Sequence, residues 1–288
     1  LTHINLPSGI TNIGTGAFEH SGLTSIELPK ELTGIGHWAF RGTHLSAIYL
    51  PRKLNYLGIN AFSDIGTLKE VTVTSNINNG WDYWGAPFYS SPLTTVVIEE
   101  GVTKIPARMF YNQKGIMNIN FPSTMKEIGG YAFKNTSLKT VLFPSAIEKI
   151  GNYAFGDIVT LTSIDVGSNL VTGRNAFSGS KNLVTINLKS GARKIVTLPS
   201  TLKTIGEGAF SNTGLKEIVF PASMKTIPKG ILDSTQVEKI VLSEGVEEIG
   251  DYAFANNKLL KSVVFPSTLK KIGRAAFKNS NLESVTLP

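Results

Sequence analysis

The chain's four histidines are the first residues to test for chemistry, because imidazole serves both as a general base and as a metal ligand. They are His3, His20, His37 and His44. His20 and His44 are 24 residues apart, which is two residues out of register with a 22-residue repeat in the chain. They therefore form no column that could hold one metal ion. We expect surface histidines and no metal site.

Nucleophilic and phosphate chemistry also lack a sequence signal. There is no G-x-S-x-G nucleophile elbow, no Walker motif and no dinucleotide fingerprint. Stretches such as "GIGHWAF" (34–40) belong to the repeat. The absence of cysteine excludes disulfides and thiolate chemistry. We expect no catalytic residue, no cofactor and no enzyme activity.

An aromatic-rich stretch, "NINNGWDYWGAPFYSS" (76–91), is the first candidate for binding. Its Trp81, Tyr83, Trp84 and Tyr89 lie among Asn, Gly and Ser residues that are typical of a loop. Exposed rings of this kind could stack on a sugar or anchor a protein partner. Alternatively, they pack locally over a defect in the repeat. In either case Phe88 is expected to point inward.

The basic charge suggests a second candidate, an anionic-partner patch. The net charge is +7 and the isoelectric point is about 9.4, which raises the possibility of an anionic polymer as partner. Between Tyr252 and Leu282 there is no acid but there are six basic residues: Lys258, Lys261, Lys270, Lys271, Arg274 and Lys278. The alternative is a solvated or domain-facing end. No recognition helix or aromatic RNA-binding motif accompanies the charge, so we expect no specific nucleic acid.

These residues must be positioned by an internal repeat, L-x-x-I-x-L-P-x-x-L-x-x-I-G-x-x-A-F, with a period of 22–23 residues. Its last position is occupied twelve times, by Phe18, Phe40, Phe62, Phe88, Phe110, Phe133, Phe155, Phe177, Phe210, Leu232, Phe254 and Phe277. Two longer intervals indicate insertions near 74–87 and 189–199. A single unit cannot bury its apolar side, but stacked units can. We expect one domain, 1–288, of about twelve units.

Each unit predicts a strand, a proline that ends it, a short apolar pair and a turn carrying Ala-Phe. The glycine of I-G is replaced by proline at Pro106 and Pro228, so this position should not need a positive φ. It suits the start of a short helical turn. The Phe residues would then stack into a continuous spine.

The outward side of the predicted strands is the third candidate. Most outward residues are polar, but Tyr49 is aromatic, and Val219, Val241 and Val264 follow one another in successive units. A contiguous apolar stripe often marks an interaction site. The alternative is that β-branched residues are simply good strand formers.

The repeat, which covers essentially the whole chain, resembles the BspA-like leucine-rich repeat family. The resemblance implies a right-handed leucine-rich repeat solenoid with a parallel β-sheet on the concave face and short turns or helical pieces outside. Family members commonly carry a Cys three residues after the Phe, where small side chains should still fit. Here the residues in that slot are Ser21, Thr43, Ile65, Thr136, Ile158, Ser180, Thr213, Asn257 and Ser280.

The same resemblance implies function and location, because family members are commonly bacterial cell-surface or secreted adhesins. We expect a non-enzymatic, monomeric recognition module that binds a macromolecule, protein before glycan, outside the cell or at its surface. The alternative is a structural spacer or scaffold that presents other domains. No signal peptide and no apolar run long enough to span a membrane are found in this chain, and both ends look excised from a longer one.

Overall fold

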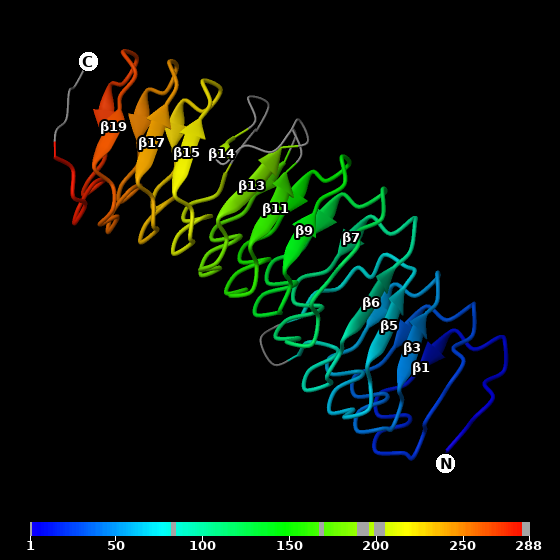
Figure 1. The fold of residues 1–288 in the computed structure, drawn as a ribbon. Coiled ribbons are helices and arrows are strands. Elements are labelled where there is room, and N and C mark those ends of the chain that lie inside the picture. Colours follow the sequence, from blue (N-terminus) through cyan, green and yellow to red (C-terminus); the bar gives the residue numbers. More distant parts are fainter. Residues whose placement is uncertain (1, 82–84, 167–169, 189–195, 199–204, 284–288) are drawn as a thin grey trace. The chain divides into compact units, whose positions relative to one another are not determined.

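The computed structural model describes residues 2–81, 85–166, 170–188, 196–198 and 205–283 (Figure 1). Within these residues the chain forms twenty short strands and no helix. Every strand pairing is parallel, and partners are one repeat apart. This is the leucine-rich repeat solenoid that the sequence predicts, with about ten regular turns.

Two strand sets recur along the chain. The face strands are β3 (Ala47–Leu50), β5 (Glu70–Val73), β6 (Thr95–Ile98), β9 (Thr140–Leu142), β11 (Ser163–Val166), β13 (Thr185–Leu188), β14 (Val196–Thr197), β15 (Glu217–Phe220), β17 (Lys239–Leu242) and β19 (Ser262–Val264). The side strands are β1 (Asn12–Ile13), β2 (Gly34–Ile35), β4 (Tyr56–Leu57), β7 (Lys104–Ile105), β8 (Glu127–Ile128), β10 (Lys149–Ile150), β12 (Val171–Thr172), β16 (Thr226–Ile227), β18 (Glu248–Ile249) and β20 (Lys271–Ile272). The side strands correspond to the short apolar pair of the repeat.

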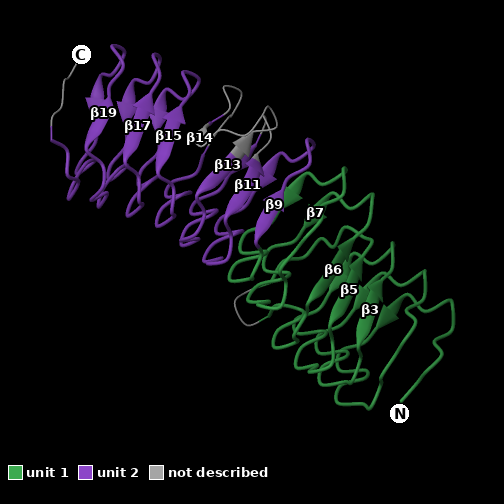
Figure 2. Ribbon diagram, in the orientation of Figure 1, with its two compact units in different colours: residues 1–138 green, residues 139–288 purple. Residues whose placement is uncertain are grey.

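The chain divides into two compact units, residues 1–138 and 139–288 (Figure 2). Unit 1 holds the face sheet β3-β5-β6 and the side-strand groups β1-β2-β4 and β7-β8. Unit 2 holds the face sheets β13-β11-β9 and β14-β15-β17-β19, with side-strand groups β10-β12 and β16-β18-β20. The single domain over 1–288 stays a prediction.

Face strands alternate between the core and solvent, as their period-two pattern requires. In β3, Ile48 and Leu50 are buried while Ala47 and Tyr49 are exposed. β5, β6, β15 and β17 follow the same order. The outward positions are therefore the ones available to a partner.

The predicted Phe spine is present within each unit. Neighbouring rings from Phe18 through Phe133 stack with centroids 5.0–6.0 Å apart. Phe155, Phe177 and Phe210 stack at 5.7 Å. Phe88 is fully buried in this stack, which confirms its inward orientation. Each ring pair adds about 0.5–1.5 kcal/mol beyond its burial.

The outer turn is not the short helical turn that we predicted from the sequence. Alternate N–H groups bond inside the coil, as Arg41 N does to Trp38 O at 3.1 Å, and the others bond to the next coil, as Phe40 N does to Ala61 O at 2.8 Å. Left-handed residues such as Trp38 (φ 54°) and Gly42 (φ 65°) produce this alternation. A helix would use these N–H groups within its own coil and leave the next coil unbonded.

The glycine of I-G does lack a positive φ, as predicted, but its role is close approach between coils. A Cβ added to Gly58 would lie 2.4 Å from the carbonyl carbon of Gly36 and 2.4 Å from the amide nitrogen of His37. Gly129 and Gly206 face the preceding coil's backbone in the same way. An added Cβ at Gly14, in the first coil, would meet nothing within 4 Å.

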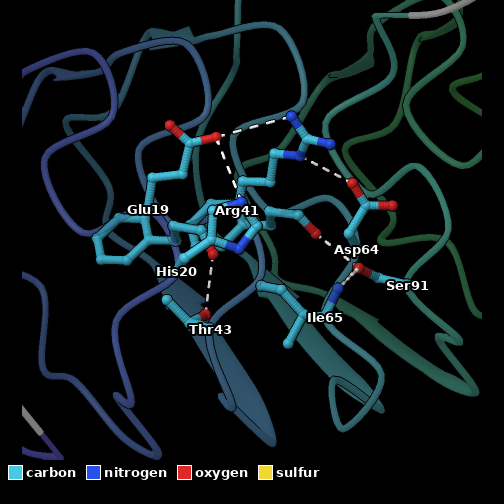
Figure 3. Close-up of polar contacts among 9 residues, drawn as sticks. Glu19, His20, Arg41, Thr43, Asp64, Ile65 and Ser91 are labelled. Carbon is cyan, nitrogen blue, oxygen red and sulfur yellow. Dashed lines mark hydrogen bonds and ion pairs between the residues drawn. The ribbon is translucent and has the colours of Figure 1, made fainter.

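The slot three residues after the Phe forms a buried polar column that satisfies the turn's carbonyl groups (Figure 3). Thr43 Oγ1 donates to Phe40 O at 2.9 Å, and Thr136 and Thr213 repeat this bond. Where the slot holds Ile65, the next coil compensates. There Ser91 Oγ donates to Phe62 O at 2.7 Å and accepts from Ile65 N at 3.0 Å.

The predicted insertion near 189–199 contains one described strand. β14 lies inside that range and pairs in register with β15, so Thr197 is opposite Val219. The segment "IVTLP" (195–199) has the apolar alternation of the other face strands, which explains its pairing. Residues 189–195 lie outside the described residues.

The close approach at Gly58 makes a first prediction. We expect Gly58→Ala to lower the free energy of unfolding by about 1–3 kcal/mol, because the added methyl group forces two coils apart. Urea unfolding followed by circular dichroism measures this. Gly14→Ala is the matched control and should be neutral or stabilising by about 0.4–1 kcal/mol. Equal losses in both variants would contradict the close-approach role.

The polar column makes a second prediction. We expect Ser91→Ala to cost about 1–3 kcal/mol, because it leaves the Phe62 carbonyl and the Ile65 N–H buried without partners. Ser63 is the matched control, since it is equally buried and its hydroxyl has no hydrogen-bond partner among the described residues. Ser63→Ala should therefore change the urea midpoint little, and a loss as large as that of Ser91→Ala would refute the assignment.

Candidate functional site

The face sheet of unit 2 carries the predicted valine stripe, Val219, Val241 and Val264. The three residues are in register on neighbouring strands β15, β17 and β19. Val264 is 58% exposed, and the other two are partly exposed. The stripe is therefore a contiguous apolar surface on a rigid sheet.

A polar row borders the valine stripe. Glu217, Lys239 and Ser262 occupy the first positions of β15, β17 and β19 and are also in register. Lys239 and Ser262 are exposed, and Glu217 is partly exposed. An apolar centre with a polar rim is the usual anatomy of a protein-binding patch.

Tyr49 lies on the face sheet of unit 1, whereas the valine stripe belongs to unit 2. It is 49% exposed and is opposite Thr72, which is in turn opposite Val97. Val97 is 41% exposed. Unit 1 thus presents its own, more mixed row.

In the aromatic loop, Trp81 is packed rather than displayed. It is 5% exposed, and its Nε1 donates to Leu57 O at 3.0 Å. The Asn79 amide also accepts from Leu57 N at 3.0 Å and donates to Leu57 O at 2.6 Å. These side chains replace the backbone ladder that the next side strand would supply to β4, which favours the packing alternative for Trp81.

Tyr89 is the other candidate of this loop that the structure describes. Tyr89 is partly exposed, and its backbone carbonyl accepts from Asp64 N at 2.9 Å. Tyr83 and Trp84 lie outside the described residues. The structure therefore leaves Tyr89 as the one described candidate of this loop with accessible surface.

The six basic residues of the anionic-partner patch are all exposed, but half of them are paired. Lys270 contacts Glu247 at 2.7 Å, Lys271 contacts Glu248 at 2.6 Å and Lys261 contacts Glu283 at 3.4 Å. The Arg274 guanidinium lies 5.2 Å from the centroid of the Tyr252 ring. Lys258 and Lys278 make no ion pair with any described residue. This pairing favours the solvated alternative.

These ion pairs shift the pKa values of their members. The hydrogen bond from Lys270, helped by the charges of Lys270 and Lys225, lowers the pKa of Glu247 below its ordinary value. The hydrogen bond to Glu248 raises the pKa of Lys271. The sequence already indicates the pairs of Glu247, because Lys225, Glu247 and Lys270 occupy the same slot in successive repeats. The pair of Lys271 with Glu248 was missed, although these two residues are also one repeat apart.

No catalytic constellation is assembled in the parts of the chain that the structure describes. There, no group of three His, Cys, Asp or Glu residues is placed to hold a metal ion. His37 instead accepts from Ile59 N at its Nδ1, at 2.8 Å, and its Nε2 lies 3.3 Å from the Tyr56 hydroxyl. Among the described residues, none belongs to a helix long and apolar enough to cross a membrane.

Sequence reasoning also missed an aromatic group formed by the outer turn of the second coil and side strand β4 of the third. Trp38 is 39% exposed and Tyr56 is 41% exposed. The His37 ring lies between them, with ring centroids 5.9 Å from Trp38 and 6.3 Å from Tyr56. Aligning the repeats at the position before Ala-Phe would have shown that Trp38 faces outward there.

Comparison with known proteins finds the same repeat and the same fold. The family model for the BspA type leucine rich repeat region matches residues 1–83, 86–196 and 191–288. A leucine-rich repeat protein of Bacteroides ovatus is 24% identical and has a TM-score of 0.68, over 96% of this chain and 69% of that one. One of Eubacterium ventriosum is 21% identical with a TM-score of 0.51, over 99% and 78%.

No curated protein matches the chain. At these identities the solved structures show the fold alone, and the family assignment depends on the repeat model, which spans nearly all of the sequence. The solenoid, the Phe spine and the register of both strand sets fit that model. The chain belongs to the BspA type leucine-rich repeat family.

Proposed function

We propose that this chain is a non-enzymatic recognition module that binds a protein partner through the face sheet of unit 2. The observation that carries the proposal is the valine stripe, three outward apolar side chains in register beside a polar row. Contiguous exposed apolar surface on a folded protein commonly marks an interaction site.

A protein partner suits the stripe better than a glycan. Aliphatic β-branched side chains gain free energy by burial against other apolar groups, at about 25 cal/mol per Å². A sugar prefers an aromatic ring to stack on and polar groups to bond, and the stripe has no ring. The neighbouring Lys239 and Glu217 could fix the partner's orientation.

The proposed location is the cell surface or the medium, with the chain acting as an adhesin-like module. Support comes from family membership, since BspA-like proteins are commonly displayed or secreted by bacteria. The proposal also includes a single domain over 1–288 and a monomeric chain. An anionic polymer partner is proposed to use the three patch residues that form no ion pair with a described residue, Lys258, Arg274 and Lys278.

A structural spacer is the second candidate, favoured by the paired surface charges. Glu247 lies between Lys225 at 3.6 Å and Lys270 at 2.7 Å, on the coils before and after it. Such cross-strand ion pairs stabilise the register of the strands and keep the surface soluble. Neither role requires a binding partner. A spacer would tolerate changes at the valine stripe.

The third prediction separates the two candidates. In the triple variant Val219→Thr, Val241→Thr and Val264→Thr, the β-branched shape is kept while the apolar surface is lost. We expect the wild-type chain to bind a member of a panel of immobilised extracellular-matrix proteins in surface plasmon resonance. The triple variant should bind it at least about tenfold more weakly, equivalent to about 1.4 kcal/mol.

Val97→Thr is the matched control, because Val97 is an outward valine on the face sheet of unit 1. It should leave the affinity unchanged. A parallel glycan array tests the less favoured ligand class. If the folded chain binds neither panel, or if the triple variant binds as tightly as the wild type, recognition through the stripe is refuted and the spacer is favoured.

A further inference from the structure

The residue directly before Ala-Phe forms an outer column along the turns of each unit. In unit 2 this outer column consists of Tyr153, Asn175, Gly208, Gly230, Tyr252 and Ala275. All six residues have a left-handed backbone, with φ between 54° and 62°. Most of the column carries side chains, but two successive coils have glycine.

The two glycines are not explained by backbone conformation, because Tyr, Asn and Ala adopt the same φ at neighbouring positions. At Gly208 an added Cβ would lie 2.1 Å from Asn175 Oδ1, so the Asn175 side chain would have to shift to make room for it. At Gly230 an added Cβ would meet nothing within 4 Å. Gly230 therefore leaves open space that the repeat could have filled.

The space beside Gly230 is part of a hollow with a volume of about 430 Å³, which Asn175 and Tyr252 also line. The volume falls within the range of small-molecule sites, about 300–1,000 Å³. The remaining lining residues are Arg174, Glu207, Ser211, Lys229 and Asp233. All of them belong to unit 2, so the hollow is complete within that unit.

The charges around the hollow cancel. Arg174 pairs with Glu207 at 2.9 Å. Lys229 forms no ion pair with a described residue, and Asp233, which is half-buried, accepts from Asn256 Nδ2 at 2.8 Å. An anion here would meet two carboxylates and a cation would meet two basic groups. A neutral ligand with many hydroxyl groups can bond to both kinds.

Tyr252 supplies an aromatic wall. Its ring is partly exposed at the hollow, and the Arg274 guanidinium, from the coil after it, lies 5.2 Å from its centroid. A phenol ring offers an apolar face for the C–H groups of a sugar and a hydroxyl for one further hydrogen bond.

We propose that this hollow is a binding site for a neutral oligosaccharide. A sugar ring stacks on Tyr252, its hydroxyl groups donate to Asp233 and to Asn175 Oδ1, and they accept from Lys229. The site lies on the outer turns and shares no residue with the valine stripe. It is therefore independent of the proposed protein recognition and would add a second ligand class to the module.

The decisive variant fills the gap with a side chain that the fold already uses at this position. Gly230→Tyr reproduces the residue type and backbone of Tyr153 and Tyr252 and should fold normally. Ala275→Tyr is the matched control, because it adds the same ring to the same column outside the hollow. Tyr252→Ala removes the aromatic wall. Alanine tolerates the left-handed backbone of this position, because Ala275 has the same φ of 54°.

Isothermal titration calorimetry with the whole chain tests the site against neutral gluco-, xylo- and manno-hexaoses, with hyaluronan hexasaccharide and short peptides as further arms. We expect a neutral hexaose to bind. Gly230→Tyr and Tyr252→Ala should each weaken it at least about tenfold, while Ala275→Tyr should retain the wild-type affinity. The triple valine variant should also retain it.

Three results would overturn the proposal. One is that no neutral hexaose binds to a chain shown to be folded by circular dichroism. Another is that only the anionic or peptide arm binds in the hollow. The third is that Gly230→Tyr and Ala275→Tyr bind a hexaose equally well, which would place any sugar site elsewhere.

Discussion

Neighbouring coils are held at hydrogen-bonding distance along both the face strands and the outer turns, and every other feature has to fit that spacing. Parallel strands lie about 4.8 Å apart, and the Phe rings follow with centroids 5.0–6.0 Å apart in unit 1. In eleven of the twelve units, all but that of Phe88, glycine or proline occupies the I-G position. Alternate N–H groups of the turn must then serve the neighbouring coil, which is why the turn is not helical.

Because each coil depends on the next, local departures from the repeat have to be repaired locally. Where Ile65 offers no hydroxyl, Ser91 reaches back from the next coil to bond the Phe62 carbonyl. Where the side-strand ladder stops after β4, Asn79 and Trp81 take its place on Leu57. An unusual residue in this chain can thus be a structural repair, as Trp81 is within the aromatic segment.

We consequently expect binding at the positions whose side chains the coil spacing does not constrain. Two such sets are the outward residues of the face strands and the outer column before Ala-Phe. The first gathers the valine stripe in unit 2, and the second opens a hollow where Gly208 and Gly230 follow each other. Many surface charges have a partner one coil away, as Lys271 has Glu248, so net charge alone says little about binding.

The period, the face strands, the Phe spine and the family could be predicted from the sequence alone, because each of these depends on residues exactly one repeat apart. The outward register of Val219, Val241 and Val264 follows from the same spacing, and so does the pairing of Lys270 with Glu247. The folded structure was needed to show that the alternating hydrogen bonds of the turn exclude a helical turn, that Trp81 is buried, and that Lys271 is paired with Glu248. It alone also showed the space beside Gly230. These outcomes depend on which atoms of the neighbouring coil face a side chain, and a one-dimensional pattern does not contain that information.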